Sequence, residues 1–374
     1  MTKSNRAAGP VLIFIASMFL FICAVSIFVA KESYSANWSD LRKGYIDTHI
    51  HLDCGRIPDV ENRDEIKAKR YRLAGANLIS QMSRVGVVKA IVMPPPQVVG
   101  YEISVGILDL SDGVRRFRKR LFLAEGGKVL NPLIHSYLKE DITPMILEAF
   151  DKRAQDLVDA GIVAFGELSI LHLSFRDGHP FSEVAADHPM LLVLADVSAR
   201  TGIPIDIHME AVPNRMKTPD GLNRISIENP SFLHPNIEQF EALLSYNRDT
   251  KIVWQHIGWD NTGYMTVKLV RRLINTHPNL YIALRVEAPI RRKMGLPMYN
   301  MIVDGEGKIK KEWLDLFKEY PERFVIGSDE FIGVQGEERA HPQSFEETWA
   351  MIDQLPEHLA EKIGRANAAR IYNL

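Results

Sequence analysis

Eight short apolar runs alternate with longer amphipathic stretches from residue 37 to the end of the chain. The runs are 45–49, 87–93, 120–124, 162–168, 203–208, 251–256, 280–286 and 323–329. Such alternation of strand and helix is typical of parallel βαβ units, and eight units complete a barrel. We therefore predict an α/β fold, a (β/α)8 TIM barrel, with helices at 144–161, 188–202 and 263–278. An open doubly wound sheet is disfavoured because no glycine-rich phosphate loop follows the first run.

The N-terminus differs from the rest of the chain. Residues 11–30, VLIFIASMFLFICAVSIFVA, are almost wholly apolar and long enough to span a bilayer. Lys3 and Arg6 precede this run, which predicts a cytoplasmic N-terminus and a catalytic part outside the cytoplasm, periplasmic or extracellular. We expect residues 1–36 to be a transmembrane anchor and 37–374 the barrel. Cleavage near Ala24-Val25-Ser26 is the alternative, and would make the protein secreted.

The overall composition excludes several classes of partner. A formal net charge of −2 and 46% hydrophobic residues are ordinary for a globular protein and leave no basic surface for nucleic acid. Of two cysteines, only Cys54 lies outside the apolar run, so the barrel forms no intrachain disulfide. We expect a small-molecule substrate. The sequence leaves open whether the chain forms a homo-oligomer.

Five of the eight expected strands end in a residue that can bind a cation: His49 with His51, Glu167, His208, His256 and Asp329. Barrel chemistry is located at these strand ends. Alternate residues of a strand share a face, so Asp47, His49 and His51 should form one row, opposite Ile46, Thr48 and Ile50. Each residue alone has a structural explanation, as a helix cap or a buried histidine, but their joint position favours a site for a divalent metal. Imidazole and carboxylate ligands suit zinc or manganese.

The remaining histidines do not follow this pattern. Five precede a proline in loop-like settings and three do not end an expected strand, so we predict that all eight lie outside the site. They are His179, His188, His234, His277, His341, His135, His172 and His358.

The order of the ligand residues resembles the amidohydrolase superfamily of metal-dependent barrel hydrolases. YIDTHIHLD resembles its opening signature, SRVGVVKAIVMPPP and AGIVAFGEL its second and fourth strands, RFVIGSDEF its eighth strand and IGRANAARIYNL its last helix. The match extends over residues 45–374, and its pieces are specific only together.

The resemblance implies roles for the aligned positions. His49, His51 and Asp329 would bind one metal, His208 and His256 a second, and Glu167 would bridge them as in TatD-type hydrolases. Relatives with one metal use the sixth-strand histidine on the substrate, so His256 is also a catalytic candidate, and the metal count stays open. Asp329 would transfer the proton of the attacking water, which a bound divalent ion makes acidic, with a pKa of about 7.

The resemblance leaves the reaction open among three readings. The leading prediction is hydrolysis of an amide, ester or lactone, with a phosphoester less favoured. A one-metal decarboxylase of an unsaturated or aromatic acid is the alternative, and Glu167 argues against it. A non-catalytic binding protein conflicts with the intact ligand set.

Substrate contacts are predicted with less support from the sequence. Arg285, Arg291 and Arg292 in or after strand seven could clamp a carboxylate or phosphate, or could pair with acidic neighbours. We take Arg285 as the candidate. Trp254 and Trp259 flank His256; we expect Trp254 in the core, and Trp259 could line a pocket. Glu210 should share the face of His208 if that strand continues.

Overall fold

The structure, a computed structural model, describes residues 44–57, 59–100, 105–286, 296–337 and 345–374. The expected N-terminal span, Arg291, Arg292 and His341 lie outside these ranges. Within them, no helix has both the length and the apolar character that a membrane crossing needs.

All eight expected strands are present. They are β1 (Tyr45–Leu52), β2 (Val87–Val92), β3 (Leu121–Leu123), β5 (Phe165–His172), β7 (Ile205–Met209), β10 (Ile252–Ile257), β11 (Leu280–Leu284) and β12 (Phe324–Ile326). Neighbours pair in parallel in the order β3-β2-β1-β12-β11-β10-β7-β5, and β4 (Glu125–Gly126), one residue beyond β3, pairs with β5. The segment 121–126 thus pairs with β2 through β3 and with β5 through β4. This pairing connects the two ends of the strand order, β3 and β5. This α/β fold with a mostly parallel sheet is consistent with a TIM barrel.

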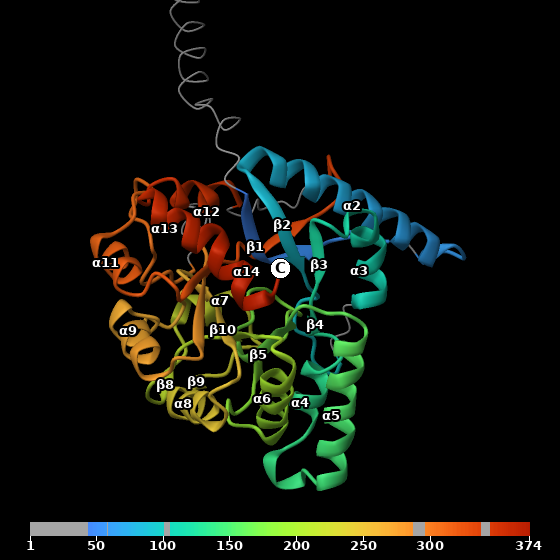
Figure 1. Cartoon of the computed structure of the whole chain (residues 1–374). Coiled ribbons are helices and arrows are strands. Elements are labelled where there is room, and N and C mark those ends of the chain that lie inside the picture. The colour runs from blue at the N-terminus through green and yellow to red at the C-terminus, as the bar shows by residue number, and fades with distance from the viewer. Residues whose placement is uncertain (1–43, 58, 101–104, 287–295, 338–344) are drawn as a thin grey trace, which may run out of the picture. The chain divides into compact units, whose positions relative to one another are not determined.

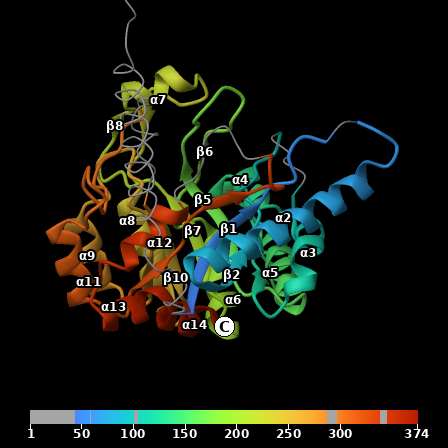
Figure 2. The same cartoon turned by 90° about the horizontal axis from the view of Figure 1, so that it is seen from above.

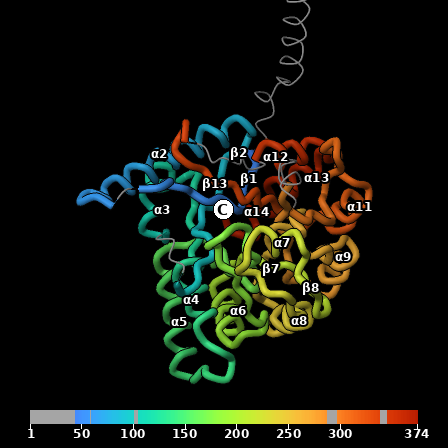
Figure 3. Tube along the Cα trace, turned by 180° about the vertical axis from the view of Figure 1, so that it is seen from behind, coloured from blue at the N-terminus to red at the C-terminus, as the bar shows by residue number. Residues whose placement is uncertain are grey.

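Helices surround the strands in Figures 1 and 3. Local sequence explains their ends: Thr143 accepts a hydrogen bond from the Ile146 N–H at the start of α5, and Gly202 ends α6 in the left-handed conformation. The helices expected at 144–161, 188–202 and 263–278 are α5, α6 and α9. The bounds are α2 (Arg63–Val85), α3 (Ile107–Val114), α4 (Asn131–Ser136), α5 (Pro144–Asp159), α6 (Pro189–Thr201), α7 (Asp220–Ile225), α8 (Ile237–Tyr246), α9 (Val267–Thr276), α11 (Lys311–Glu319), α12 (Phe345–Ile352), α13 (Glu357–Glu361) and α14 (Asn367–Tyr372).

Several short strands lie outside the series of eight. Strand β6 (Ser182–Glu183) pairs antiparallel with β5, and β13 (Glu330–Ile332) pairs parallel with β1. In the long connection after β7, β8 (Met216–Lys217) and β9 (Phe232–Leu233) form a separate pair. Figure 2 shows α7 and β8 at the end of the strands opposite to α14.

The apolar core has two main parts. One fills the space between strands and helices; Trp254 belongs to it as expected, packing on Phe240 of α8 and donating its indole N–H to the Met209 carbonyl. The other lies at the end of the strands that α14 covers, where Ile371 and Tyr372 pack against strand residues such as Val253 and Val325. This end of the strands is thus filled by an apolar core, as expected where the functional residues lie at the carboxyl ends of the strands.

One expectation about β1 is wrong. The pairing of β1 with β2 shifts register between Asp47 and Ile50, so strict alternation fails there. Asp47 accepts a hydrogen bond from the Trp349 indole of α12 instead of sharing a row with His49 and His51. Ile46 and Ile50, expected on one face, pack in different parts of the core.

Candidate metal centre

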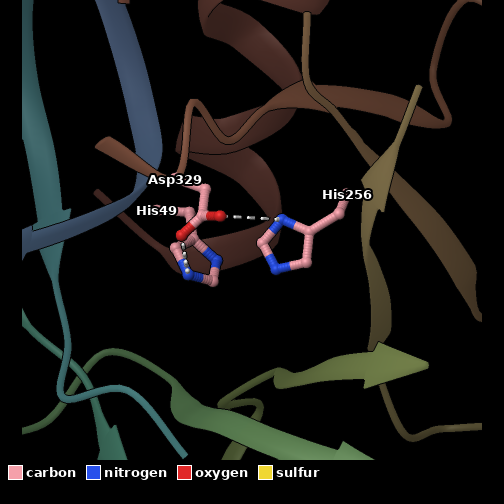
Figure 4. A group of neighbouring side chains, drawn as sticks. All are labelled: His49, His256 and Asp329. Atoms are coloured by element: carbon pink, nitrogen blue, oxygen red, sulfur yellow. Dashed lines mark ion pairs between the residues drawn. The ribbon is translucent and has the colours of Figure 1, made fainter. Parts of the chain in front are cut away.

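The six residues predicted as metal ligands converge on one place. His49 and His51 come from β1, Glu167 from β5, His208 from β7, His256 from β10, and Asp329 follows β12. Their potential ligand atoms form three overlapping groups, each with all atoms within 4.8 Å of one another: His49, His256 and Asp329; His49, His51 and Glu167; and Glu167, His208 and His256. Figure 4 shows the first group, with both imidazoles facing the Asp329 carboxylate.

The two histidines of β1 point their Nε2 atoms at each other, 3.0 Å apart. The Nδ1 of His51 lies 2.9 Å from the Met93 carbonyl oxygen, and the Nδ1 of His49 lies 3.1 Å from Oε1 of Gln255. Because a carbonyl oxygen only accepts, each Nδ1 carries a ring proton, so that each imidazole in its neutral form presents the Nε2 lone pair to the centre. A proton or a metal cation between the two Nε2 atoms satisfies this contact, and zinc–nitrogen bonds of about 2.0–2.1 Å fit two nitrogens at this separation.

The two carboxylate oxygens of Glu167 face two different pairs of histidines. Its Oε1 lies 2.8 Å from both His208 Nδ1 and His256 Nε2. Its Oε2 lies 3.5 Å from His49 Nε2 and 3.6 Å from His51 Nε2. This is the arrangement expected of a carboxylate between two cations.

Asp329 completes the set on the side of the β1 histidines. Its Oδ1 lies 3.2 Å from His51 Nε2 and 3.7 Å from His49 Nε2. Its Oδ2 pairs with the guanidinium of Arg285, which is buried and lies over the Trp259 ring, 3.8 Å from the ring centroid. The predicted substrate residue Arg285 thus reaches the site, but it does so as the partner of a proposed ligand.

Two of these residues have an unusual backbone. His256 has φ of 65° and Asp329 φ of 55°, in the left-handed region that non-glycine residues rarely occupy. At β10 the register with β11 shifts between Trp254 and Ile257, and both Gln255 and His256 contact site residues although neighbours in a regular strand face opposite ways. Such strain is common where a fold positions functional groups.

The electrostatics keep both carboxylates ionised. Burial opposes ionisation of Glu167, but His49 and the hydrogen bonds from His208 and His256 hold its pKa well below the usual range. For Asp329 burial is likewise outweighed, here by Arg285 and the histidines, and the pKa is lowered. Burial alone would lower the pKa of His49, yet Glu167 and Asp329 raise it to about 9. These values show how strongly the carboxylates attract positive charge to this point.

A cavity opens over the metal centre, with a volume of about 1040 Å³ that includes its open mouth. Its wall is rich in rings: His172 lies 4.6 Å from His208 between ring centroids, Phe175 lies 5.5 Å from Trp259, and Phe331 lies 4.3 Å from His51. Trp259 lines this cavity, as the sequence suggested. Glu210 lines it as well, although β7 ends at Met209 and the continuation of that strand on which its prediction depended does not occur.

Two histidines were wrongly placed outside the site. His172 and His179 both line the cavity, with ring centroids 5.0 Å apart. Strand β5 continues past the expected end and finishes at His172; the apolar residues Ile170 and Leu171 were the signal for this extension. His179 does precede a proline in a loop, and no sequence signal indicates that this loop folds over the cavity. The other excluded histidines within the described ranges do not line it.

A search for related families gives an independent result. The model of the Amidohydrolase family matches residues 143–374, which is more than half of the chain. The chain belongs to the amidohydrolase family. It is therefore an enzyme of the amidohydrolase type, in a family that is typically metal-dependent. Glu167, His208, His256 and Asp329 lie within the matched stretch, and His49 and His51 precede it.

Solved structures show distant similarity. An amidohydrolase 2 from Bifidobacterium longum subsp. infantis is 12% identical, with a TM-score of 0.41, over 88% of this chain and 98% of its own. An apo structure from Agrobacterium tumefaciens is 13% identical, TM-score 0.45, over 88% and 94%. A triazine hydrolase from Arthobacter aurescens is 13% identical, TM-score 0.39, over 86% and 70%. Similarity at this level does not bear on the activity of this chain, and no curated protein matches it.

Proposed function

We propose that this amidohydrolase cleaves an amide, ester or lactone bond of a small molecule with the help of two divalent ions, most favourably zinc, with manganese as the alternative. A phosphoester is a less favoured substrate. The observation that carries the proposal is the Glu167 carboxylate, whose two oxygens face two separate pairs of imidazoles. A site for one ion has no need of the second pair.

The donor set assigns the ligands as follows. His49, His51 and Asp329 would hold one ion, His208 and His256 the other, and Glu167 would bind both, in the order of TatD-type hydrolases. When bound, such ions lower the pKa of water to about 7 and polarise the bond to be cleaved. The convergence of the His49 and His51 Nε2 atoms, 3.0 Å apart, supports this assignment without reference to any relative.

The chain's own residues then position and move the proton. Asp329 is the proposed base, because its Oδ1 faces the centre while Arg285 keeps the carboxylate ionised through Oδ2. A base of this kind contributes typically 10²–10⁴-fold to the rate. Arg285 also lines the cavity, and we retain it as a substrate contact. His256, between Glu167 and Asp329, is the second catalytic candidate.

The test is metal analysis followed by a product screen. The purified full-length chain should contain two equivalents of metal and hydrolyse at least one of a set of lactones, esters and amides, and chelation should abolish the activity. One equivalent of metal with release of carbon dioxide from an unsaturated or aromatic acid would replace the proposal with the decarboxylase alternative. Tight ligand binding without turnover at any metal would show a non-catalytic protein.

We also propose that residues 1–36 anchor the enzyme in a membrane with the catalytic part outside the cytoplasm. The apolar run 11–30 and the preceding Lys3 and Arg6 support this location. Fractionation of cells that express the full chain tests it: the protein should remain with the membrane after a high-salt wash and be digested by protease added to intact spheroplasts. Release of a shortened chain would show cleavage instead.

A further inference from the structure

Strand β5 carries the proposed bridging ligand Glu167 in a stretch where its short neighbours β4 and β6 do not pair with it. Strand β4 pairs with β5 only before Glu167, and β6 pairs with it only from Leu171 onward. Ser169 lies between these two pairings and is 2% exposed. Because buried backbone N–H and C=O groups need partners, those of Ser169 must find them elsewhere in the fold.

Both backbone groups of Ser169 bond to side chains of α4. Its N–H donates to Asn131 Oδ1 at 2.8 Å, and its carbonyl oxygen accepts from His135 Nε2 at 2.8 Å. Asn131 and His135 are one helical turn apart, so they lie on the same face of α4. An acceptor and a donor on this face thus meet the N–H and C=O of one residue, as the backbone of a neighbouring strand does in a sheet.

Further hydrogen bonds fix the two sides of this contact. Asn131 is fully buried, and its Nδ2 donates to the Gln97 carbonyl oxygen at 2.8 Å. The side chain of Gln97 in turn donates to the Val105 carbonyl oxygen at 2.8 Å. On the other side, Ser169 Oγ lies 3.1 Å from Ser182 Oγ of β6. The contact therefore connects β5 to α4, to the segment that follows β2, and to β6.

Ser169 is adjacent to two proposed metal ligands. Glu167 lies two residues before it on β5, and His208 is its partner across the pairing with β7. The register of this pairing shifts both before Leu168 and after Ser169. Regular pairing is disrupted at such shifts and does not by itself fix the backbone there. The two bonds from α4 are therefore a local constraint on the part of β5 that presents the Glu167 carboxylate.

We propose that Asn131 and His135 are positioning residues that hold Ser169 in place and thereby set where the Glu167 carboxylate lies between the two pairs of histidines. This inference rests on the proposed metal site and extends it to α4, which contributes no residue to the cavity lining. Groups that orient metal ligands typically change metal affinity or activity by 10–100-fold when they are replaced. Since α4 acts through the backbone of β5, we expect effects at the lower end of this range.

The experiment measures the zinc affinity of the full-length protein by competition with a chelator, together with the free energy of unfolding of the metal-free form. His135→Phe keeps a ring but loses the N–H donor, and should weaken zinc binding about tenfold. His135→Gln should restore most of the affinity, because its amide NH₂ can donate to the same carbonyl oxygen. Rescue by this variant is not expected if the ring serves only as packing.

Asn131→Leu should also weaken zinc binding about tenfold, because it removes the acceptor for the Ser169 N–H. Asn367→Leu is the matched control. Asn367 is likewise fully buried, and its Nδ2 donates to the backbone carbonyl oxygens of Pro321 and Phe324, both at 2.8 Å, at the end of the strands that α14 covers. Its replacement should lower the free energy of unfolding and leave zinc affinity unchanged.

A second background separates positioning of Glu167 from general damage to the site. In Glu167→Gln, His135→Phe should not weaken the remaining zinc binding further, because its effect passes through the Glu167 carboxylate. An equal loss in both backgrounds, unchanged affinity in His135→Phe and Asn131→Leu, or an equal loss in Asn367→Leu would overturn the proposal. If the wild-type protein itself bound no zinc, the proposed metal site would fail and this inference with it, whereas normal binding by wild type and variants alike would refute the inference alone.

Discussion

Replacing Arg285 with methionine should destabilise the metal-free protein far more than the metal-loaded protein. Arg285 is the cationic partner of Asp329, and their side chains are only 5% and 13% exposed. Removing one member of a buried ion pair costs about 3–5 kcal/mol, because the other charge remains buried without its partner. The nearby histidines still stabilise the Asp329 carboxylate, so we expect a cost toward the lower end of this range. Methionine keeps much of the packing on Trp259, so the loss comes mainly from the charge.

A bound divalent ion would supply the missing positive charge to Asp329. The cost of Arg285→Met should therefore be smaller in the loaded protein. By linkage, that difference must appear as tighter metal binding by the variant, and each 1.4 kcal/mol corresponds to about tenfold in affinity. We expect at least about tenfold tighter binding, together with a loss of turnover.

Urea unfolding of the metal-free and metal-loaded proteins, with zinc affinity from chelator competition, measures both effects. Arg200→Met is the control, because Arg200 pairs with Asp151 at 2.7 Å on the surface, where side-chain exposures of 43% and 38% limit such a pair to about 0–1 kcal/mol. Equal destabilisation of the metal-free and loaded forms, or a loss no greater than that of Arg200→Met, would refute this reasoning.

Three further substitutions test other parts of the structure. Asp329→Asn should retain metal by direct metal analysis yet lose about 10²–10⁴-fold in kcat, and an active variant would exclude Asp329 as the base. Burial raises the pKa of Glu330 from 4.5 to about 9; neighbouring acids add to this shift and Arg285 opposes it. Between pH 4.5 and about 9, Glu330 is therefore ionised in the unfolded chain but protonated in the folded protein. The free energy of unfolding should fall as the pH rises through this range. Glu330→Gln cannot ionise, so its free energy of unfolding should decrease less steeply with pH than that of the wild type, by up to about 1.4 kcal/mol per pH unit. Parallel curves of unfolding free energy against pH for the variant and the wild type would contradict this. Gly258→Ala should lower the melting temperature by several degrees, because φ at Gly258 is 107° and an added Cβ would lie 2.2 Å from the Arg285 carbonyl oxygen. An unchanged melting temperature would show that the backbone relaxes to accommodate the Cβ.

The arrangement of strands was predictable because local chemistry specifies it. Alternating apolar runs and amphipathic stretches place strands and helices, and parallel strands bring their carboxyl ends to one edge. That is why His208 and Glu167, 41 residues apart in sequence, are 2.8 Å apart at Nδ1 and Oε1. The predicted ligands followed from this one rule.

The tertiary structure decided what the rule does not contain. Regular alternation along β1 predicted that Asp47 lies in one row with His49 and His51, but a register shift in β1 turns Asp47 away from them. In a regular β10, Gln255 and His256 would face opposite sides. A register shift in β10 lets both contact the site. His179 reaches the cavity through the path of a loop, which no local pattern encodes. The partners of Asp329 and His49 are Arg285, just after β11, and Gln255 of β10, and a sequence does not state which distant groups meet. Residue types and periodicity therefore predicted where the candidate metal centre lies, whereas packing across the strands decided which side chains surround it.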